Sequence, residues 1–363
     1  MALAPRPGVL DIAPYVGGRA VVAGVTEAVK LSSNESALGP SPKAVAAYQE
    51  AVKSMSIYPE GSAEILREAV GEHYGLDPVR IVCGNGSNEI LSLLAHAYVN
   101  PGEEVLFSEY AFIVYRLAAL SNSGIPVAAP EKNLRVDVDA MLARVTPKTR
   151  VVYLANPNNP TGSYLTPAEV RRLHAGLSPE TLLVIDAAYA EYIKRNDYDD
   201  GAELVGRYPN VVMTRTFSKV YALAGLRVGW AWCPPAVADV LHRIRDPFNV
   251  SVPSQCAAVA ALKDKDHIAR SIAYNDRWLP WITEAVRKTG LTVHDSVGNF
   301  VLIQFPKTPG KTAAEADKFL CERGLILRGV ANYNLPDCLR LTVGPEEPMR
   351  RVAAALAEFM ARR

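Results

Sequence analysis

Lys219 stands directly after an apolar, β-branched run, in the tetrapeptide Thr-Phe-Ser-Lys. A lysine at the end of a buried strand can be desolvated. Desolvation lowers the pKa of the ammonium group, so the neutral amine is available to form a Schiff base. Thr216 and Ser218 precede it and Arg227 follows, and hydroxyl groups with a guanidinium suit a phosphate group. A lone lysine is usually a solvated surface charge, so the hypothesis depends on the residues around Lys219.

Asp186 ends another apolar run, Leu-Leu-Val-Ile. A buried carboxylate there needs a partner, or it takes up a proton, and a protonated pyridine nitrogen is one such partner. A helix cap or a structural ion pair is the commoner role for a single aspartate at a strand end. Tyr189, three residues further on, could bond a phenolate oxygen and thus favours the functional interpretation.

The segment 84–89, Gly-Asn-Gly-Ser-Asn-Glu, can be interpreted as an anion cradle. Its small residues let the backbone approach a ligand, and Gly86, Ser87 and Asn88 would offer N–H groups at a helix start. A plain strand-to-helix turn explains the same residues about as well. A dinucleotide fingerprint is excluded, because no third glycine or alanine follows at the required spacing.

These segments follow short apolar runs that alternate with helical patterns, an arrangement typical of a mostly parallel sheet covered by helices. Helix starts are predicted at Ser41-Pro42 and at Thr166-Pro167-Ala168-Glu169. Ligands gather at the carboxyl ends of parallel strands, so the polar groups should meet at one edge. Strands are expected over 80–83, 104–107, 151–154, 182–185, 211–215 and 228–232.

Beyond residue 247 the pattern predicts a smaller α+β domain. We expect three regions: an N-terminal arm over 1–40 that joins the small domain, a large domain over 41–247, and a small domain over 248–363. Helices are expected over 253–262 and 268–288, and strands over 291–294, 300–305 and 339–343.

The composition indicates a soluble globular protein whose ligand is a small molecule. The 39 Lys and Arg residues balance 38 Asp and Glu, so no excess charge points to nucleic acid or an anionic membrane. Five scattered cysteines without a C-x-x-C pair argue against disulfides and a zinc site, and they are expected to be buried thiols. Without a signal peptide or a membrane span in the sequence, we expect a cytoplasmic protein that binds no metal.

Five ordered motifs carry a specific resemblance: G-N-G-S-N-E (84–89), N-P-N-N-P-T-G (156–162), D-A-A-Y (186–189), T-F-S-K (216–219) and G-L-R-V-G (225–229). Through these motifs, the chain resembles the fold-type-I aminotransferases that depend on pyridoxal 5'-phosphate (PLP). Within this group, it is most similar to the histidinol-phosphate aminotransferase branch. Further matches are L-S-S-N-E-S-A-L-G-P-S-P (31–42), Y-P-E-G (58–61) and V-A-N-Y-N-L-P-D-C-L-R-L-T-V-G (330–344). The resemblance covers essentially the whole chain.

The resemblance implies a role for each matching residue. Lys219 would carry PLP and move the α-proton, and Asp186 would keep the pyridine nitrogen protonated so that the ring acts as an electron sink. Tyr189 and Asn159 would bond the ring oxygen, and Tyr110 would stack on the ring. The cofactor phosphate would be held by Gly86, Ser87, Asn88, Thr216, Ser218 and Arg227. Tyr58 would reach the neighbouring subunit's phosphate, which implies a homodimer.

At the substrate end, the resemblance implies that Arg340, Arg328 and Tyr15 bind the phosphate of histidinol phosphate and the carboxylate of glutamate or 2-oxoglutarate. A guanidinium suits both anions because it can form two parallel bonds. Arg328 is followed by Gly329 where the family pattern has proline, so a surface charge is the alternative for Arg328.

Two PLP alternatives stay open: an aminotransferase for phenylalanine and tyrosine, and a threonine-phosphate decarboxylase. A nucleotide-binding protein or dehydrogenase could use the same kind of sheet without PLP, since fold does not decide function. A non-catalytic relative would be expected to lack the lysine or the aspartate, and both are present.

Overall fold

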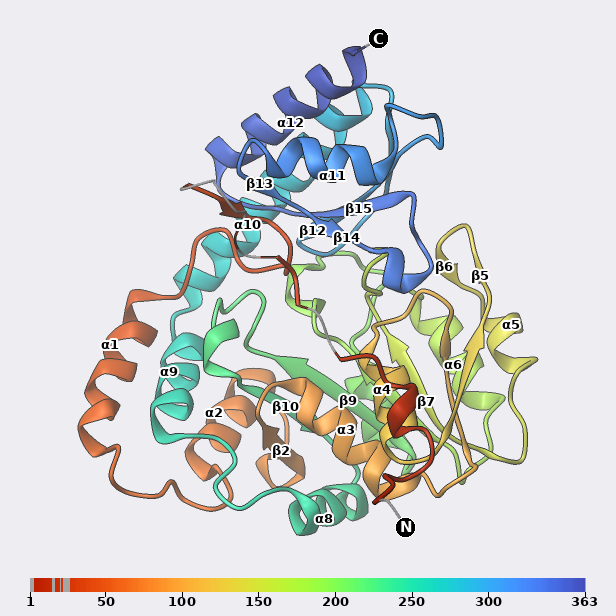
Figure 1. Ribbon diagram of the computed structural model, residues 1–363. Helices are drawn as coiled ribbons and strands as arrows, with labels where there is room; N and C mark the ends of the chain where they lie inside the picture. The colour runs from red at the N-terminus through yellow and green to blue at the C-terminus, as the bar shows by residue number, and fades with distance from the viewer. Residues whose placement is uncertain (1–2, 15–16, 20, 22–26, 363) are drawn as a thin grey trace.

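The computed structural model describes residues 3–14, 17–19, 21 and 27–362. A seven-stranded sheet lies at the centre of the larger part (Figure 1), in the order β2-β10-β9-β8-β7-β3-β4. Neighbouring strands are parallel except at β10, which is antiparallel to β9 and β2. The strands are β2 (Ile81–Gly84), β3 (Glu104–Ser108), β4 (Ile125–Ala129), β7 (Thr149–Ala155), β8 (Leu182–Asp186), β9 (Val211–Thr216) and β10 (Gly229–Trp232). The predicted α/β fold with a mostly parallel sheet is confirmed.

Helices cover both faces of this sheet because its strands are apolar on both sides. In β7, Val151 and Tyr153 face a core shared with α3, α4 and α8, whereas Val152 and Leu154 face the core that holds α2, α6 and α7. This alternation follows from the two-residue period of a strand. The helices are α1 (Pro42–Ala51), α2 (Glu64–Tyr74), α3 (Ser87–Tyr98), α4 (Val114–Ser121), α5 (Val138–Leu142), α6 (Pro167–Ala175), α7 (Ala202–Arg207), α8 (Pro235–Ile244) and α9 (Val252–Lys263).

Both predicted helix starts are confirmed. The Ser41 side chain accepts a hydrogen bond from the backbone N–H of Lys43 at the start of α1. Thr166 and Glu169 form a reciprocal capping box at the start of α6, with Pro167 in the first turn. These side chains pair backbone N–H groups that the first turn of a helix leaves without partners.

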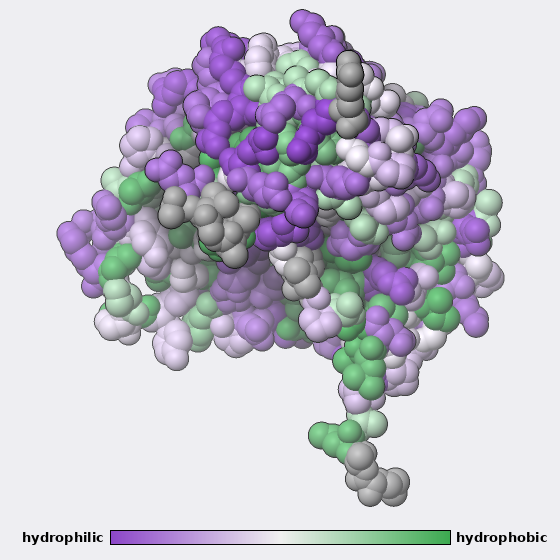
Figure 2. All heavy atoms as spheres, turned by 45° about the horizontal axis from the view of Figure 1, so that its top comes forward, coloured by the Kyte–Doolittle hydropathy of each residue, from purple (hydrophilic) through white to green (hydrophobic). Residues whose placement is uncertain are grey.

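A smaller antiparallel sheet, in the order β11-β12-β15-β14, forms the second part of the molecule. Its strands are β11 (Thr292–His294), β12 (Phe300–Gln304), β14 (Arg328–Gly329) and β15 (Cys338–Thr342), and its helices are α10 (Lys265–Arg287), α11 (Ala313–Cys321) and α12 (Glu346–Ala361). They lie at the top of Figure 1, and the upper surface in Figure 2 is largely hydrophilic. Strand β1 (Val29–Lys30) pairs with β13 (Leu325–Ile326), so the chain at β1 joins this part. Arg6, nearer the N-terminus, instead donates to the backbone oxygen of Ser121 at the end of α4 in the larger part.

Helix α9 lies after residue 247 but packs against α1 and α2. Its buried Ala257, Ala258 and Leu262 belong to the core of the large sheet, whereas the core of the smaller sheet includes Trp278 at the middle of α10. We therefore propose that the large domain extends through α9, and that the small domain begins with α10.

Among the described residues, no helix combines the length and the apolar character needed to cross a membrane. All five cysteines are free, and four are buried as expected; Cys256 is the exception, since it is partly exposed. In the same described ranges, no three His, Cys, Asp or Glu side chains gather as a metal site would require.

Candidate active site

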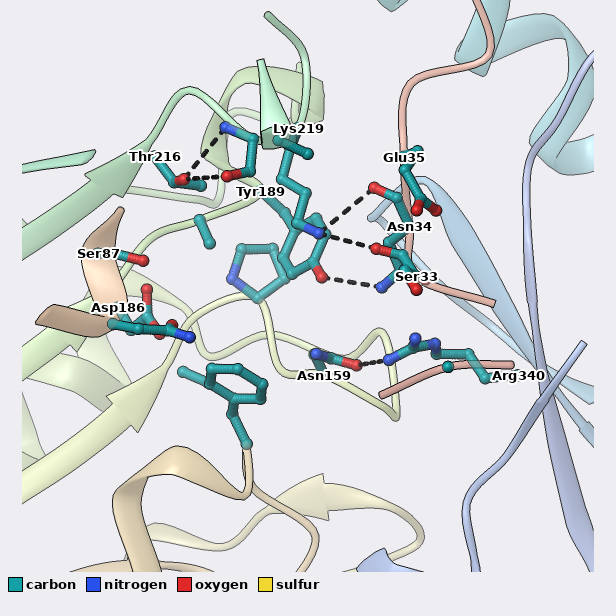
Figure 3. Close-up of a pocket in the computed structure, with 18 of the residues that line it drawn as sticks. Ser33, Asn34, Glu35, Ser87, Asn159, Asp186, Tyr189, Thr216, Lys219 and Arg340 are labelled. Atoms are coloured by element: carbon teal, nitrogen blue, oxygen red, sulfur yellow. Dashed lines mark hydrogen bonds between the residues drawn. The ribbon is translucent and has the colours of Figure 1, made fainter. Parts of the chain in front are cut away.

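The polar segments predicted at the strand ends meet around a cavity of about 250 Å³, between the two sheets. Figure 3 shows Lys219, Tyr189, Asp186, Asn159 and Arg340 directed toward this space. The predicted residues that line the cavity are Ser87, Asn88, Asn159, Asp186, Tyr189, Thr216, Ser218, Lys219, Arg227, Arg328 and Arg340. The structure thus brings most of the residues singled out in the sequence together.

Lys219 follows β9 through a short connection and reaches the middle of the cavity. Its Nζ donates to the backbone oxygens of Ser33 at 3.1 Å and Asn34 at 3.4 Å (Figure 3). Burial, and then the nearby positive charge of Arg340, lower the pKa of Lys219 to about 7. A lysine in this environment is a neutral nucleophile and base near neutral pH.

Asp186 ends β8 and is 5% exposed. The Tyr115 hydroxyl donates to its Oδ2 at 2.9 Å, and the Thr214 hydroxyl donates to its Oδ1 at 3.1 Å. Burial raises the pKa of Asp186, while these two hydrogen bonds and the charge of Lys219 oppose the rise. The carboxylate is therefore held in one orientation and would gain from a cationic partner.

Tyr189 and Asn159 lie on neighbouring loops of the same edge. The Tyr189 hydroxyl accepts a hydrogen bond from Asn34 Nδ2 at 2.8 Å. Burial raises the pKa of Tyr189 to about 12, against the opposing influence of Arg340 and Asn34, so the phenol is protonated at neutral pH. Asn159 Oδ1 accepts a hydrogen bond from Arg340, which ties this loop to the small sheet.

A cradle of small residues and hydroxyl groups forms between β2, β9 and β10. Gly86 precedes α3 with φ +76°, and a Cβ there would lie 2.5 Å from Arg227 Nη2. A Cβ on Gly229 would lie 2.3 Å from the backbone nitrogen of Ser87. Arg227 Nη1 also donates to Ser218 Oγ at 3.4 Å. The glycines let a guanidinium and the N–H groups of a helix start converge, which suits a phosphate.

Two arginines stand side by side where the small sheet meets the cavity. Arg328 and Arg340 are direct partners in the antiparallel pair β14–β15, so their side chains share a face of the sheet. Arg340 Nη2 donates to the backbone oxygen of Ser32 at 2.8 Å. Like charges opposite each other are unfavourable alone, and an anion between them would offset this cost.

Two predicted residues lie elsewhere, and a third falls outside the described residues. Tyr110 does not line the cavity, and Phe112 does. Tyr58 is 79% exposed and stacks on Phe248, with 4.7 Å between ring centroids, at a surface outside this cavity. Tyr15 lies outside the described residues.

Two groups that hold the site together were not predicted from the sequence. Tyr115 bonds Asp186 from α4, and nothing in its spacing indicates that contact. Asn34 donates to Tyr189, and its backbone N–H donates to Thr342 Oγ1 at 2.9 Å. Asn34 lies in the motif over 31–42 that carried part of the resemblance, so that motif was a usable signal.

Comparisons with known proteins show the family of the chain. Residues 26–356 match the family model for aminotransferase class I and II. The chain is 57% identical to a histidinol-phosphate aminotransferase of Rhodospirillum centenum, over 98% of each chain, and 54% identical to one of Paramagnetospirillum magneticum, over 99% of each. A crystal structure of histidinol-phosphate aminotransferase from Sinorhizobium meliloti in complex with pyridoxal-5'-phosphate superposes with a TM-score of 0.88 at 30% identity, covering 99% of this chain and 98% of that one. The similarity extends over nearly the full length, and the chain belongs to the aminotransferase class I and II family.

Proposed function

We propose that the protein transfers the amino group of L-histidinol phosphate to 2-oxoglutarate with PLP as cofactor, giving imidazole acetol phosphate and glutamate in histidine biosynthesis. The observation that carries this proposal is the similarity to histidinol-phosphate aminotransferases, at 54–57% identity over nearly the whole chain. The arrangement of Lys219, Asp186 and paired arginines in one cavity supports it.

The residues present fit PLP. The cradle at Gly86 has no room for a Cβ next to Arg227, and it faces the first turn of α3, whose N–H groups suit an anion. Ser87, Asn88, Thr216, Ser218 and Arg227 would hold the cofactor phosphate. Asp186 would face the ring nitrogen, and Tyr189 with Asn159 the ring oxygen.

When bound, PLP supplies an electron-poor ring that draws electrons away from the α-carbon of the substrate. Lys219 Nζ would hold the cofactor and then carry the proton from the α-carbon, a task for which a pKa of about 7 is suited. Asp186 holds a proton at the ring nitrogen, and Tyr115 and Thr214 keep its carboxylate in place. The Tyr189 phenol, held by Asn34, would restrain the oxygen side of the ring.

Arg340 and Arg328 bind the anionic group of each substrate in turn. The phosphate of histidinol phosphate and the carboxylate of 2-oxoglutarate both match two guanidinium groups on one face of a sheet. Asn159 orients Arg340 through their hydrogen bond.

Single-turnover half-reactions test the substrate. L-Histidinol phosphate should convert the aldehyde cofactor to its amine form more efficiently than phenylalanine, tyrosine or phosphothreonine, and 2-oxoglutarate should restore the aldehyde absorbance. A faster reaction with phenylalanine or tyrosine would identify an aromatic aminotransferase, and release of carbon dioxide from phosphothreonine would identify a decarboxylase.

Borohydride reduction tests the cofactor lysine. It should fix the cofactor on Lys219, and an adduct on another lysine would refute that assignment.

Arg340→Lys tests the arginine pair. The variant keeps the charge but loses the bidentate fork, so it should weaken both substrates, and the phosphorylated amine more because a phosphate presents more acceptor oxygens. We expect the KM for histidinol phosphate to rise roughly tenfold to a hundredfold, equivalent to about 1.4 to 2.8 kcal/mol. An unchanged KM for both substrates would remove Arg340 from the binding site.

We also propose that the protein is a cytoplasmic homodimer whose ligands are small molecules rather than nucleic acid or membrane. The exposed Tyr58, with its neighbours Ile57 and Phe248, supports a subunit interface, because exposed apolar clusters of this kind commonly mark protein contacts. Tyr58 would then complete the phosphate cradle of the neighbouring subunit.

A further inference from the structure

Glu131 lies behind the wall of the cavity and joins two segments that form it. It stands on β5 (Glu131–Lys132), which pairs with β6 (Arg135–Val136) in a short hairpin. Its Oε1 accepts hydrogen bonds from Asn158 Nδ2 at 3.2 Å and, more weakly, from the backbone N–H of Tyr110 at 3.4 Å. Asn158 precedes Asn159 in the chain, and Tyr110 leads to Phe112, so one carboxyl group contacts both walls.

A chain of hydrogen bonds returns from this loop to the same hairpin. Asn158, which is fully buried, also donates from Nδ2 to Thr161 Oγ1 at 3.0 Å. Thr161 and Ser163 share a hydrogen bond of 2.9 Å between their hydroxyl groups, and Ser163 Oγ donates to the backbone oxygen of Leu134 at 3.0 Å. The hairpin therefore contacts the loop that carries Asn159 at two points, Glu131 and Leu134.

This network lacks hydrogen-bond donors at two of its acceptors. Glu131 Oε2 and Asn158 Oδ1 are both buried, and neither has a hydrogen-bond partner among the described residues. Both are acceptors, and a buried acceptor without a donor is costly. A proton on the carboxyl group would supply the missing donor and also remove a buried charge.

Burial and the nearby Glu109 carboxylate favour that proton. Burial raises the pKa of Glu131 to about 7; the Ser108 hydroxyl and the Tyr110 N–H oppose the rise, and the nearby Glu109 carboxylate adds to it. The other charged groups on the hairpin are Lys132 and Arg135, and Arg135 is paired with Glu169. The Tyr110 phenol, whose own pKa is raised by burial and by Glu109, stays neutral in this range.

We propose that Glu131 is a positioning residue of the active site, whose protonated carboxyl group locks the segments that carry Asn159 and Phe112, and whose ionisation loosens them. The inference rests on the proposed function, because these two segments would hold the ring of the cofactor. Glu131 does not line the cavity, so its effect on the reaction is carried by Asn158 and by the backbone of Tyr110.

Glu131→Gln tests the proposal, because the amide keeps the shape and a donor but cannot ionise. In the wild type, the folded protein holds a proton on Glu131 that the unfolded chain gives up above about pH 4.5. This contribution to stability is lost as pH rises toward 7. The unfolding midpoint of the cofactor-free wild type should therefore fall relative to that of Glu131→Gln between pH 5 and 7. Glu322→Gln, at an exposed site, is the control and should follow the wild type.

The cofactor provides a second measurement. The PLP dissociation constants of wild type and Glu131→Gln should agree at pH 6 and differ several-fold at pH 8.5, with the variant binding more tightly. The proposal would be overturned if the unfolding midpoints of wild type and Glu131→Gln changed in parallel with pH. It would also be overturned if the two proteins bound PLP with equal affinity at both pH values. Neither measurement uses an amino-acid substrate, so a wrong substrate assignment would leave both readouts unchanged.

Hydrogen exchange in the wild type covers the case in which the variant does not fold. After correction for the chemical exchange rate, amides of residues 156–163 should open more often at pH 8 than at pH 6, whereas those of β8 should not change. Equal protection of the 156–163 loop at the two pH values would refute the locking role of Glu131.

Discussion

Lys219 shows how a residue's surroundings determine its chemistry. Its ammonium group is desolvated, it lies near Arg340 and Arg227, and two backbone oxygens are its hydrogen-bond partners. In the cofactor-free protein, an amine-reactive reagent should modify Lys219 with a half-maximal rate near pH 7. Lys53, whose side chain is 71% exposed, is the comparison lysine. Peptide mapping across pH checks this, and identical profiles for the two lysines would contradict it.

Asp186 should matter through its charge. Asp186→Asn keeps the side-chain shape and the hydrogen bond to Tyr115, but a neutral amide cannot hold a proton on the ring nitrogen. The variant should fold and bind PLP, while the rate of the half-reaction should fall on the order of a thousandfold, as expected when one charge is lost from a water-poor site. Turnover close to the wild-type rate would remove Asp186 from the mechanism.

At the residue scale, the sequence indicated those groups that follow directly from strand ends. Lys219 and Asp186 each come after an apolar run, so their meeting at one sheet edge could be predicted. Phe112 could not be chosen over Tyr110, because α4 begins without a side-chain cap that would fix its start. Glu131 gave no signal either, because its hydrogen-bond partners Asn158 and Tyr110 lie 27 and 21 residues away in the chain.

Among the elements, the start of α3 depends on a close approach that only glycine allows. Gly86→Ala would place a Cβ 2.5 Å from Arg227 Nη2, on a backbone with φ +76°. The variant should weaken PLP binding roughly tenfold, about 1.4 kcal/mol, and change the binding of pyridoxal, which lacks the phosphate, far less. Gly102→Ala is the matched control, because its φ is +83° and nothing lies within 4 Å of the new Cβ. Equal losses for PLP and pyridoxal would separate Gly86 from the phosphate.

Strong apolar runs predicted the central strands of the large sheet. The edge strand β4 has a weak apolar pattern and was missed. Each predicted strand of the large sheet appears within about two residues of its expected bounds. Strand β4 was missed because it lies at the sheet edge, includes Pro126, and is mostly exposed or half-buried. Its position depends on parallel pairing with β3, a contact between segments that a local pattern does not encode.

On the scale of the whole molecule, the segment 32–34 connects the two sheets at the active site. Ser32 accepts a hydrogen bond from Arg340 of the small sheet, and Ser33 accepts one from Lys219 beside the large sheet. Asn34 contacts Thr342 on one side and Tyr189 on the other. Any shift between the two sheets therefore changes the surroundings of Lys219.

The apolar surface around Tyr58 extends this argument to a second subunit. Met55, Ile57 and Tyr58 are highly exposed, and with Phe248 they line a hollow separate from the active-site cavity. If Tyr58 serves the neighbouring site, each site takes Lys219 from one subunit and Tyr58 from the other. Lys219→Ala and Tyr58→Ala would then damage different halves of the same site.

Co-expression of the two variants tests this sharing. Lys219→Ala alone should be inactive, and Tyr58→Ala alone should bind PLP weakly. A mixed dimer holds one site in which both residues are mutated and one site in which both are intact. Random pairing makes about half of the dimers mixed, so about a quarter of all sites should recover wild-type affinity and activity. Isolation of mixed dimers through two different affinity tags, followed by PLP titration and single-turnover kinetics, checks the result. If Tyr58 served its own subunit, every site in the mixed dimer would carry one defect, and no site with wild-type affinity would appear.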